Sequence, residues 1–172
     1  MSWTVRAAMP HDVDRIDALV RELAVYEREP DAVEATPSDF AEAFFGENPL
    51  VHCLVAEVTR DDGRSDIVGM AVWFQTFSTW RGRHGIWLED LFVQPDSRGL
   101  GIGRALLEAL AAECVARGHA RLEWAVLDWN EPAHDFYRSL GARPQDEWTV
   151  WRIDRDQLDE LGRPMVRAQG PS

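Results

Sequence analysis

A cation precedes three glycines in the stretch QPDSRGLGIG, residues 94–103, where Arg98 is followed by Gly99, Gly101 and Gly103. An apolar run of helical period comes next, so the glycines lie where a helix would begin. Backbone N–H groups at a helix N-terminus attract anions, and glycines leave those groups uncovered. The spacing is neither GxGxxG nor GxxxxGK[ST], the two common phosphate motifs. The stretch therefore indicates either a phosphate-binding loop or a flexible turn.

Two acids interrupt the apolar run that comes before this stretch, GIWLEDLFV at residues 85–93. Glu89 and Asp90 are neighbours, and a strand sends neighbouring side chains to opposite faces. Because burying an unpaired carboxylate is costly, at least one of the two acids must face something polar. The plain alternatives are an edge strand or an ion pair with Arg81 or Arg83, and the functional alternative is a polar ligand.

A third polar segment, DWNEPAHDFYRSLGA at residues 128–142, has the features of a short helix. Asn130 is suited to cap its start, Pro132 lies near its first position and Gly141 ends it. The helix carries Tyr137, one of two tyrosines in the chain. By structure alone this residue would be a half-buried aromatic, whereas its phenol could also act as a proton donor.

The elements that would position these residues follow an α/β pattern, with antiparallel hairpin strands before a strand–helix–strand unit. Strands are expected at residues 3–8, 52–59, 67–76, 85–93, 122–126 and 149–153. Helices are expected to begin near residues 10, 36, 102, 132 and 156, the first being ended by Pro30 and the third by Gly118. The length of 172 residues predicts a single domain over residues 1–162, followed by a mobile tail at 163–172.

Composition argues against several classes of protein. Acidic residues outnumber basic ones by 30 to 18, and the resulting net charge of -12 argues against binding to nucleic acid. The same charge suits a cationic substrate, or solubility alone. Cys53 and Cys114 lack a metal-binding spacing, so we expect no metal and two reduced core thiols. We find no signal-peptide core and no apolar run of membrane-spanning length, which predicts a cytoplasmic protein that does not enter a membrane.

Together the three polar segments resemble the GNAT N-acetyltransferases. RGLGIG matches the R/Q-x-x-G-x-G/A acetyl-coenzyme A loop of that family, and NEPAHDFYRSLGA is similar to its late N-x-x-A/S-x-x-F/Y-Y-x-x-x-G-F/A motif. A narrower resemblance, to the spermidine/spermine N-acetyltransferase (diamine acetyltransferase) subgroup, extends over residues 5–160. It rests on RELAVYERE, FFGENPLVHCLVAEV, IWLEDLFVQPDSRGLGIG, DWNEPAHDFY and EWTVWRID.

The resemblance implies a GNAT-like central mixed, mostly antiparallel sheet, flanked by helices and splayed between the two strands that hold acetyl-CoA. It implies backbone contacts from Leu91, Phe92 and Val93 to the pantetheine and thioester end of the cofactor. It implies that the pyrophosphate lies on the loop that Arg98 leads, with contacts from Gly99, Leu100, Gly101, Ile102, Gly103 and Arg104. Asn130 and Phe136 are implied as further cofactor contacts, and Tyr137 is implied beside the coenzyme A sulfur.

On the amine side, the resemblance implies a site formed by Tyr26, Glu27, Glu89, Asp90, Asp146, Glu147 and Trp148. One departure from the subgroup leaves an alternative open. The family segment E-G-W reads Asp146-Glu147-Trp148 here, in a slightly shorter loop. Alignment on the tryptophan places Asp146 at the substrate-binding acid and Glu147 where a glycine is usual, so either carboxylate is a candidate for the amine contact.

The residue types also fit acetyl transfer to an amine. A primary amine with a pKa of about 10.4 is protonated at neutral pH and must lose a proton before it attacks a thioester. Glu89 is suited to bind the ammonium and to take that proton, directly or through water. Backbone N–H groups on the splayed strand can stabilise the oxyanion, and Tyr137 can protonate the departing thiolate. Neither cysteine is placed for an acyl-enzyme, so we expect direct transfer.

Three hypotheses follow. The first is an acetyl-CoA-dependent N-acetyltransferase that acts on a polyamine or similar small diamine, and the second changes the amine to a thialysine-like amino acid, an aminoglycoside or a protein N-terminus. The third is a non-catalytic coenzyme A-binding regulator, against which the presence of both Glu89 and Tyr137 speaks. A homodimer is also expected, because the subgroup forms dimers through its C-terminal strand. In this chain that strand would be apolar at Trp148, Val150, Trp151 and Ile153.

Overall fold

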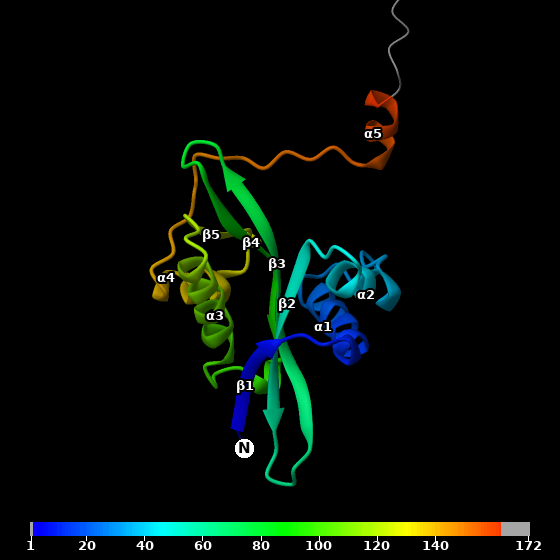
Figure 1. The fold of residues 1–172 in the computed structure, drawn as a ribbon, viewed down its shortest axis with the longest axis vertical. Coiled ribbons are helices and arrows are strands. Elements are labelled where there is room, and N and C mark those ends of the chain that lie inside the picture. Colours follow the sequence, from blue (N-terminus) through cyan, green and yellow to red (C-terminus); the bar gives the residue numbers. More distant parts are fainter. Residues whose placement is uncertain (1, 163–172) are drawn as a thin grey trace, which may run out of the picture. The chain divides into compact units, whose positions relative to one another are not determined.

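The computed structural model describes residues 2–162, which form two compact units (Figure 1). The first unit ends at Ala125 and the second begins at Val126. The tail expected at 163–172 lies outside the described residues. The single domain expected over residues 1–162 stays a prediction.

A five-stranded sheet forms the centre of the first unit, in the order β1-β2-β3-β4-β5. Its strands are β1 (Ser2–Ala7), β2 (Val51–Thr59), β3 (Ser65–Ser78), β4 (Arg83–Val93) and β5 (Leu122–Trp124). The first four strands run antiparallel to their neighbours, whereas β5 lies parallel to β4. The mixed, mostly antiparallel α/β sheet is therefore confirmed, although the strand expected at 122–126 ends two residues earlier.

Helices cover both faces of this sheet (Figure 1). On one face lie α1 (Val13–Tyr26) and α2 (Pro37–Phe45), and on the other lies α3 (Ile102–Ala116). Short 3-10 turns, η1 (Pro10–Asp12) and η2 (Pro95–Ser97), precede α1 and the entrance to α3. Apolar residues at helical spacing form each buried stripe, with Ile16, Leu19 and Leu23 on α1, and Ile102, Leu106 and Leu110 on α3.

A β-bulge in β4 changes the face toward which its side chains point. Leu88 pairs with Trp73 and Asp90 pairs with Val72, so Glu89 is the extra residue and has no partner on β3. Because Val72 and Trp73 are neighbours and point to opposite faces, Leu88 and Asp90 also point to opposite faces. Val72 belongs to the core on the α1 side of the sheet. The bulge therefore turns Asp90 toward α1.

β5 accompanies β4 over only part of its length. The parallel pairs run from Ile86 with Leu122 to Leu88 with Trp124. β4 continues to Val93, and within residues 2–162 no strand pairs with 89–93 on the β5 side. This open edge agrees with the splayed sheet that was expected.

The second unit contains α4 (Glu131–Ser139) and α5 (Arg155–Leu161), as the sequence pattern predicted. The strand expected at 149–153 was wrong, because the described residues show no strand there. A strand needs the backbone of a partner to satisfy its N–H and C=O groups, and no described strand supplies one. Its apolar side chains are exposed instead, and Trp151 has 90% of its surface accessible.

Candidate active site

The glycine stretch enters α3 with bare backbone amides. Gly99 and Gly101 have φ angles of 77° and 82°, a region that favours glycine because it has no Cβ. Gly101 is the N-cap residue of α3, and no side chain caps the helix. The first helical hydrogen bond runs from the Ala105 N–H to the Gly101 carbonyl, so the N–H groups of residues 102–104 have no partner inside the helix. This geometry favours an anion-binding loop over a flexible turn.

The open edge of β4 lies immediately before this loop in the chain. Leu91 and Val93 pair with Ala71 and Gly69 of β3 on one side, and Phe92 is buried in the core. On the other side no strand of the described residues pairs with 89–93, so its backbone groups there can pair with an extended chain that carries amides, apart from the Val93 carbonyl, which accepts from Arg98. An open edge beside a bare helix N-terminus therefore suits a long ligand with amides at one end and phosphate at the other.

Arg98 joins the loop to the ends of β4 and α1. Its Nε–H donates to the Val93 carbonyl at 3.0 Å. Its guanidinium lies 4.8 Å from the centroid of the Tyr26 ring and 5.8 Å from that of Phe92, both within the range of a cation–π contact. Arg104, the other cation of the loop region, pairs with Glu108 on the surface of α3 at 2.8 Å. Arg98 thus connects the glycine loop to Tyr26, one of the residues expected at the amine site.

Glu27 and Asp90, which lie far apart in the sequence, form an acidic region on the α1 side of the sheet. Burial, followed by the negative charges of Glu89 and Glu27, raises the pKa of Asp90 to about 6. Burial also raises the pKa of Glu27, which follows the last residue of α1. No basic side chain among the described residues lowers either pKa. Since the C-terminal end of a helix carries partial negative charge, this region favours a cation.

Glu89 has a different environment from Asp90. Its side chain is exposed and accepts a hydrogen bond from the Trp87 Nε1–H at 2.8 Å. Neither Arg81 nor Arg83 forms an ion pair with Glu89 or Asp90 in residues 2–162, so the ion-pair alternative is not observed. The sequence placed Asp90 only among the substrate contacts and did not indicate that its side chain is partly buried, because nothing distinguishes two adjacent acids in a sequence.

The other expected residues belong to the second unit. Asn130 is buried at the start of α4, and the rings of Phe136 and Tyr137 lie 5.3 Å apart on that helix. Asp146, Glu147 and Trp148 are exposed at and after a turn, in which the Trp148 N–H donates to the Gln145 carbonyl at 3.1 Å. The roles expected for these six residues stay predictions.

No group of three or more His, Cys, Asp and Glu side chains among the described residues is arranged to hold a metal ion. No described helix has both the length and the apolar character needed to cross a membrane.

Comparisons with known proteins match this geometry. The model of the Acetyltransferase (GNAT) family matches residues 16–142. The chain is 38% identical to a thialysine N-epsilon-acetyltransferase of Bos taurus, with 91% of this chain and 95% of the relative covered. It is 33% identical to a spermidine/spermine N(1)-acetyltransferase-like protein 1 of Homo sapiens, over 92% of this chain and 24% of that protein. An integron cassette protein of V. cholerae has a similar structure, with a TM-score of 0.75, 27% identity, and coverage of 95% and 99% of the two chains.

Proposed function

This chain belongs to the GNAT family of acetyltransferases, and from that premise we propose that it acetylates a primary amine of a polyamine or similar small diamine. A thialysine-like amino acid is the second candidate, and the 38% identity to a thialysine N-epsilon-acetyltransferase favours it. Both candidates are small molecules with more than one amine. The acetyl donor in the proposal is acetyl-CoA, which GNAT enzymes use in general.

The observation that carries the proposal is the group of acids Glu27, Glu89 and Asp90. The raised pKa values of Asp90 and Glu27 mean that the site tolerates further negative charge poorly. An ammonium beside these carboxylates would offset their negative charge and stabilise their ionised forms. A second ammonium would be bound by the carboxylate that the first leaves free. A small diamine therefore matches the charge of the site.

The residues around the loop fit the acetyl donor. The N–H groups of residues 102–104 and the left-handed glycines would hold the pyrophosphate, and the open edge of 91–93 would pair with pantetheine. When bound, acetyl-CoA supplies an acetyl thioester that a free amine can attack. Asn130 and Phe136 are proposed as further contacts on the ground of the family motif that they match.

The chain's own residues would then transfer two protons and stabilise one developing negative charge. An ionised Asp90 or Glu89 holds the ammonium and accepts its proton, directly or through water, which frees the nitrogen lone pair for attack. A backbone N–H on the open edge of β4 donates to the carbonyl oxygen as negative charge develops there. Tyr137 is proposed to give its phenolic proton to the departing sulfur, and the attacking nitrogen then returns its surplus proton to the phenolate, directly or through water, so that an amide and a free thiol result.

A thiol-release assay with acetyl-CoA and a panel of amines tests this function. Spermidine, spermine, putrescine and thialysine form the panel, and a reaction without amine serves as the blank. We expect putrescine and spermidine to react faster than thialysine, because the carboxylate of thialysine adds negative charge beside Asp90 and Glu27. The opposite order would select the amino acid as substrate. Binding of acetyl-CoA with no thiol release from any amine would select the regulator and contradict the proposal.

A homodimer is proposed from the exposed segment 148–153. This segment forms neither a helix nor a strand and its large apolar side chains are exposed, so that it could add a strand to the sheet of a second copy. We expect light scattering at micromolar concentration to give a dimer mass, and Trp151→Ser to give a monomer. Trp80→Ser is the matched control, because Trp80 is 89% exposed in the β3–β4 turn of the first unit. A monomer mass for the parent protein would contradict the proposal.

A further inference from the structure

Trp87 lies on β4 two residues before the bulge residue, on the same side of the sheet as Asp90. It pairs with Phe74, which is two residues from Val72 on β3 and therefore shares its face. Val72 belongs to the core on the α1 side, so Trp87 also points toward that side. Asp90 pairs with Val72 and points the same way. The indole of Trp87 is therefore on the face of the sheet that carries the acidic region.

The indole of Trp87 holds the Glu89 carboxylate on this face. Its Nε1–H donates to Oε2 of Glu89 at 2.8 Å, which is the one hydrogen bond that the Glu89 side chain makes within residues 2–162. After burial, the charge of Glu89 is the next cause of the raised pKa of Asp90, so the two carboxylates lie near one another. Regular alternation would send these neighbouring acids to opposite faces, and the bulge removes that alternation. Both acids therefore serve the same site.

The backbone is fixed at Trp87 and unpaired at Glu89. Trp87 is paired on both sides, with Phe74 of β3 and Glu123 of β5. Glu89 is paired on neither side among the described residues, since it is the extra residue of the bulge and the pairing with β5 ends at Leu88. An exposed side chain on such a residue has several rotamers available, and ordering it costs entropy. A rigid neighbour that donates to one oxygen removes part of that freedom before a ligand binds.

We propose that Trp87 is a positioning residue of the amine site, which orients the Glu89 carboxylate so that its second oxygen, Oε1, meets the substrate ammonium. This role rests on the proposed function, the acetylation of an amine. Oε1 accepts no hydrogen bond within residues 2–162, so a cation can bind it. The role is the same whether Glu89 only binds the ammonium or also accepts its proton. In either case the carboxylate must be in place before the amine attacks.

A double-mutant cycle between Trp87→Phe and Glu89→Ala tests this role, with the amine of the panel that the parent acetylates fastest. Phe keeps an aromatic ring and loses the N–H. Trp87→Phe should therefore lower kcat/KM about tenfold, the size expected for one hydrogen bond to a charged group. In the Glu89→Ala background the same change should lower kcat/KM less than about twofold, because no carboxylate is left to orient. Equal losses in the two backgrounds would show that the indole is only structural and would overturn the proposal.

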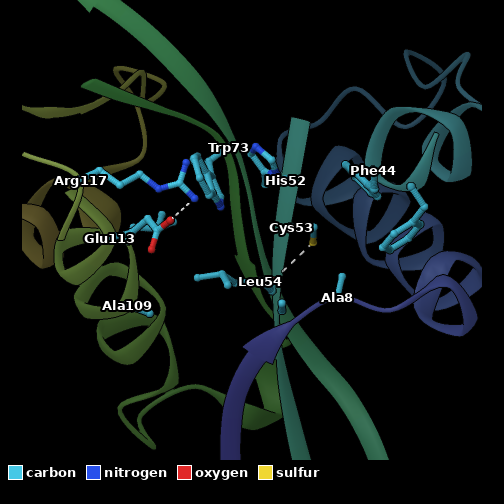
Figure 2. Close-up of a pocket in the computed structure, with 12 residues that line it drawn as sticks. Ala8, Phe44, His52, Cys53, Leu54, Trp73, Ala109, Glu113 and Arg117 are labelled. Atoms are coloured by element: carbon cyan, nitrogen blue, oxygen red, sulfur yellow. Dashed lines mark hydrogen bonds and ion pairs between the residues drawn. The ribbon is translucent and has the colours of Figure 1, made fainter. Parts of the chain in front are cut away.

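Trp73→Phe is the matched control, because it makes the same change on the other face of the sheet. Trp73 is adjacent to Val72 on β3 and points toward the α3 side. Figure 2 shows its indole between Arg117 and His52, at a cavity that these residues line. Its Nε1 is buried and has no hydrogen-bond partner among the described residues, so Phe removes no hydrogen bond. We expect a parent-like kcat/KM, and a loss equal to that of Trp87→Phe would overturn the proposal.

The indole N–H signal of Trp87 in a ¹H–¹⁵N NMR spectrum gives a second readout, which does not depend on turnover. The signal is assigned by its absence in Trp87→Phe. Glu89→Ala should move it because the acceptor is lost, and titration of the same amine into the parent should move it as the ammonium reaches Glu89. A signal that saturating amine leaves unmoved, in a parent protein that releases thiol, would overturn the proposal and leave the proposed function intact. A parent that releases no thiol with any amine would contradict the proposed function itself, and this role with it.

Discussion

Replacing Asp90 by Asn is expected to stabilise the protein at neutral pH while lowering turnover by about a hundredfold or more. The pKa of this carboxyl is raised from 3.8 to about 6 in the folded protein. Between these values the folded state holds the proton more strongly than the unfolded chain, so stability falls as pH rises from about 4 to about 6. Above pH 6 the ionised carboxylate costs up to about 3 kcal/mol of folding free energy. Asn removes that cost.

Urea unfolding at two pH values measures this effect. At pH 7 the variant should gain up to about 3 kcal/mol in unfolding free energy over the parent, and below pH 4 the difference should vanish. Glu47→Gln is the matched control, because Glu47 is an exposed acid that does not contribute to the raised pKa of Asp90. It should change stability by about 0.5 kcal/mol or less. A variant at position 90 that is less stable than the parent at pH 7 would contradict the burial argument.

The pH dependence of turnover then shows which of the two acids, Asp90 or Glu89, accepts the proton of the amine. A base must be ionised, so kcat/KM of the parent should rise with pH through about 6 if Asp90 is the acceptor. Asp90→Asn should lose that limb of the profile. If Glu89 is the acceptor, as first expected, the limb survives in Asp90→Asn. Glu89→Gln should then fall most near neutral pH and recover in part as free amine becomes available at higher pH.

Replacing Gly101 by Asp is expected to weaken acetyl-CoA binding roughly 30- to 150-fold. Gly101 is the N-cap of α3 with φ of 82°, so a side chain there is strained and its charge lies beside the bare amides. Loss of one hydrogen bond to a charged group is enough to produce a change of that size. Calorimetric titration of acetyl-CoA into the folded variant measures it.

Gly63→Asp is the control that shows whether backbone strain and added charge anywhere in the chain are enough to weaken acetyl-CoA binding. Gly63 also has φ of 82°, and a Cβ there would contact nothing within 4 Å. It lies in the turn between β2 and β3, so the same substitution adds the same charge far along the chain from α3. We expect parent-like affinity in this variant. Equal affinities for Gly101→Asp, Gly63→Asp and the parent would leave the glycine loop without a role in binding.

The features that could be predicted from the sequence depend on short-range chemistry. Glycines before an amphipathic stretch predict a helix that begins with uncovered backbone amides, whatever the rest of the chain does. Gly99 and Gly101 have the left-handed backbone that such a helix start needs. The spacing of Ile16, Leu19 and Leu23 likewise indicates α1 without reference to its partners. In each case all the information lies within one or two turns of chain.

The features that could not be predicted depend on pairing between distant segments. Regular alternation places Asp90 on the same face as Leu88, and only the register of β3 against β4 shows that the bulge reverses this. The strand expected at 149–153 failed for a related reason, because apolar composition indicates a tendency to pair but not the presence of a partner. The cavity that Leu54, Trp73 and Ala109 line is likewise formed by segments that lie far apart in the sequence.

The bulge at Glu89 makes the length of β4 matter separately from its composition. A substitution at this exposed position changes one side chain and leaves its neighbours where they are. Deletion of Glu89 would remove the bulge and leave Asp90 paired with Val72, so that no side chain changes its face. Deletion of Leu91 would instead make Asp90 and Phe92 neighbours, so that one of them would have to leave the α1 side of the sheet. We therefore expect relatives to vary in the length of β4 at position 89 rather than at position 91.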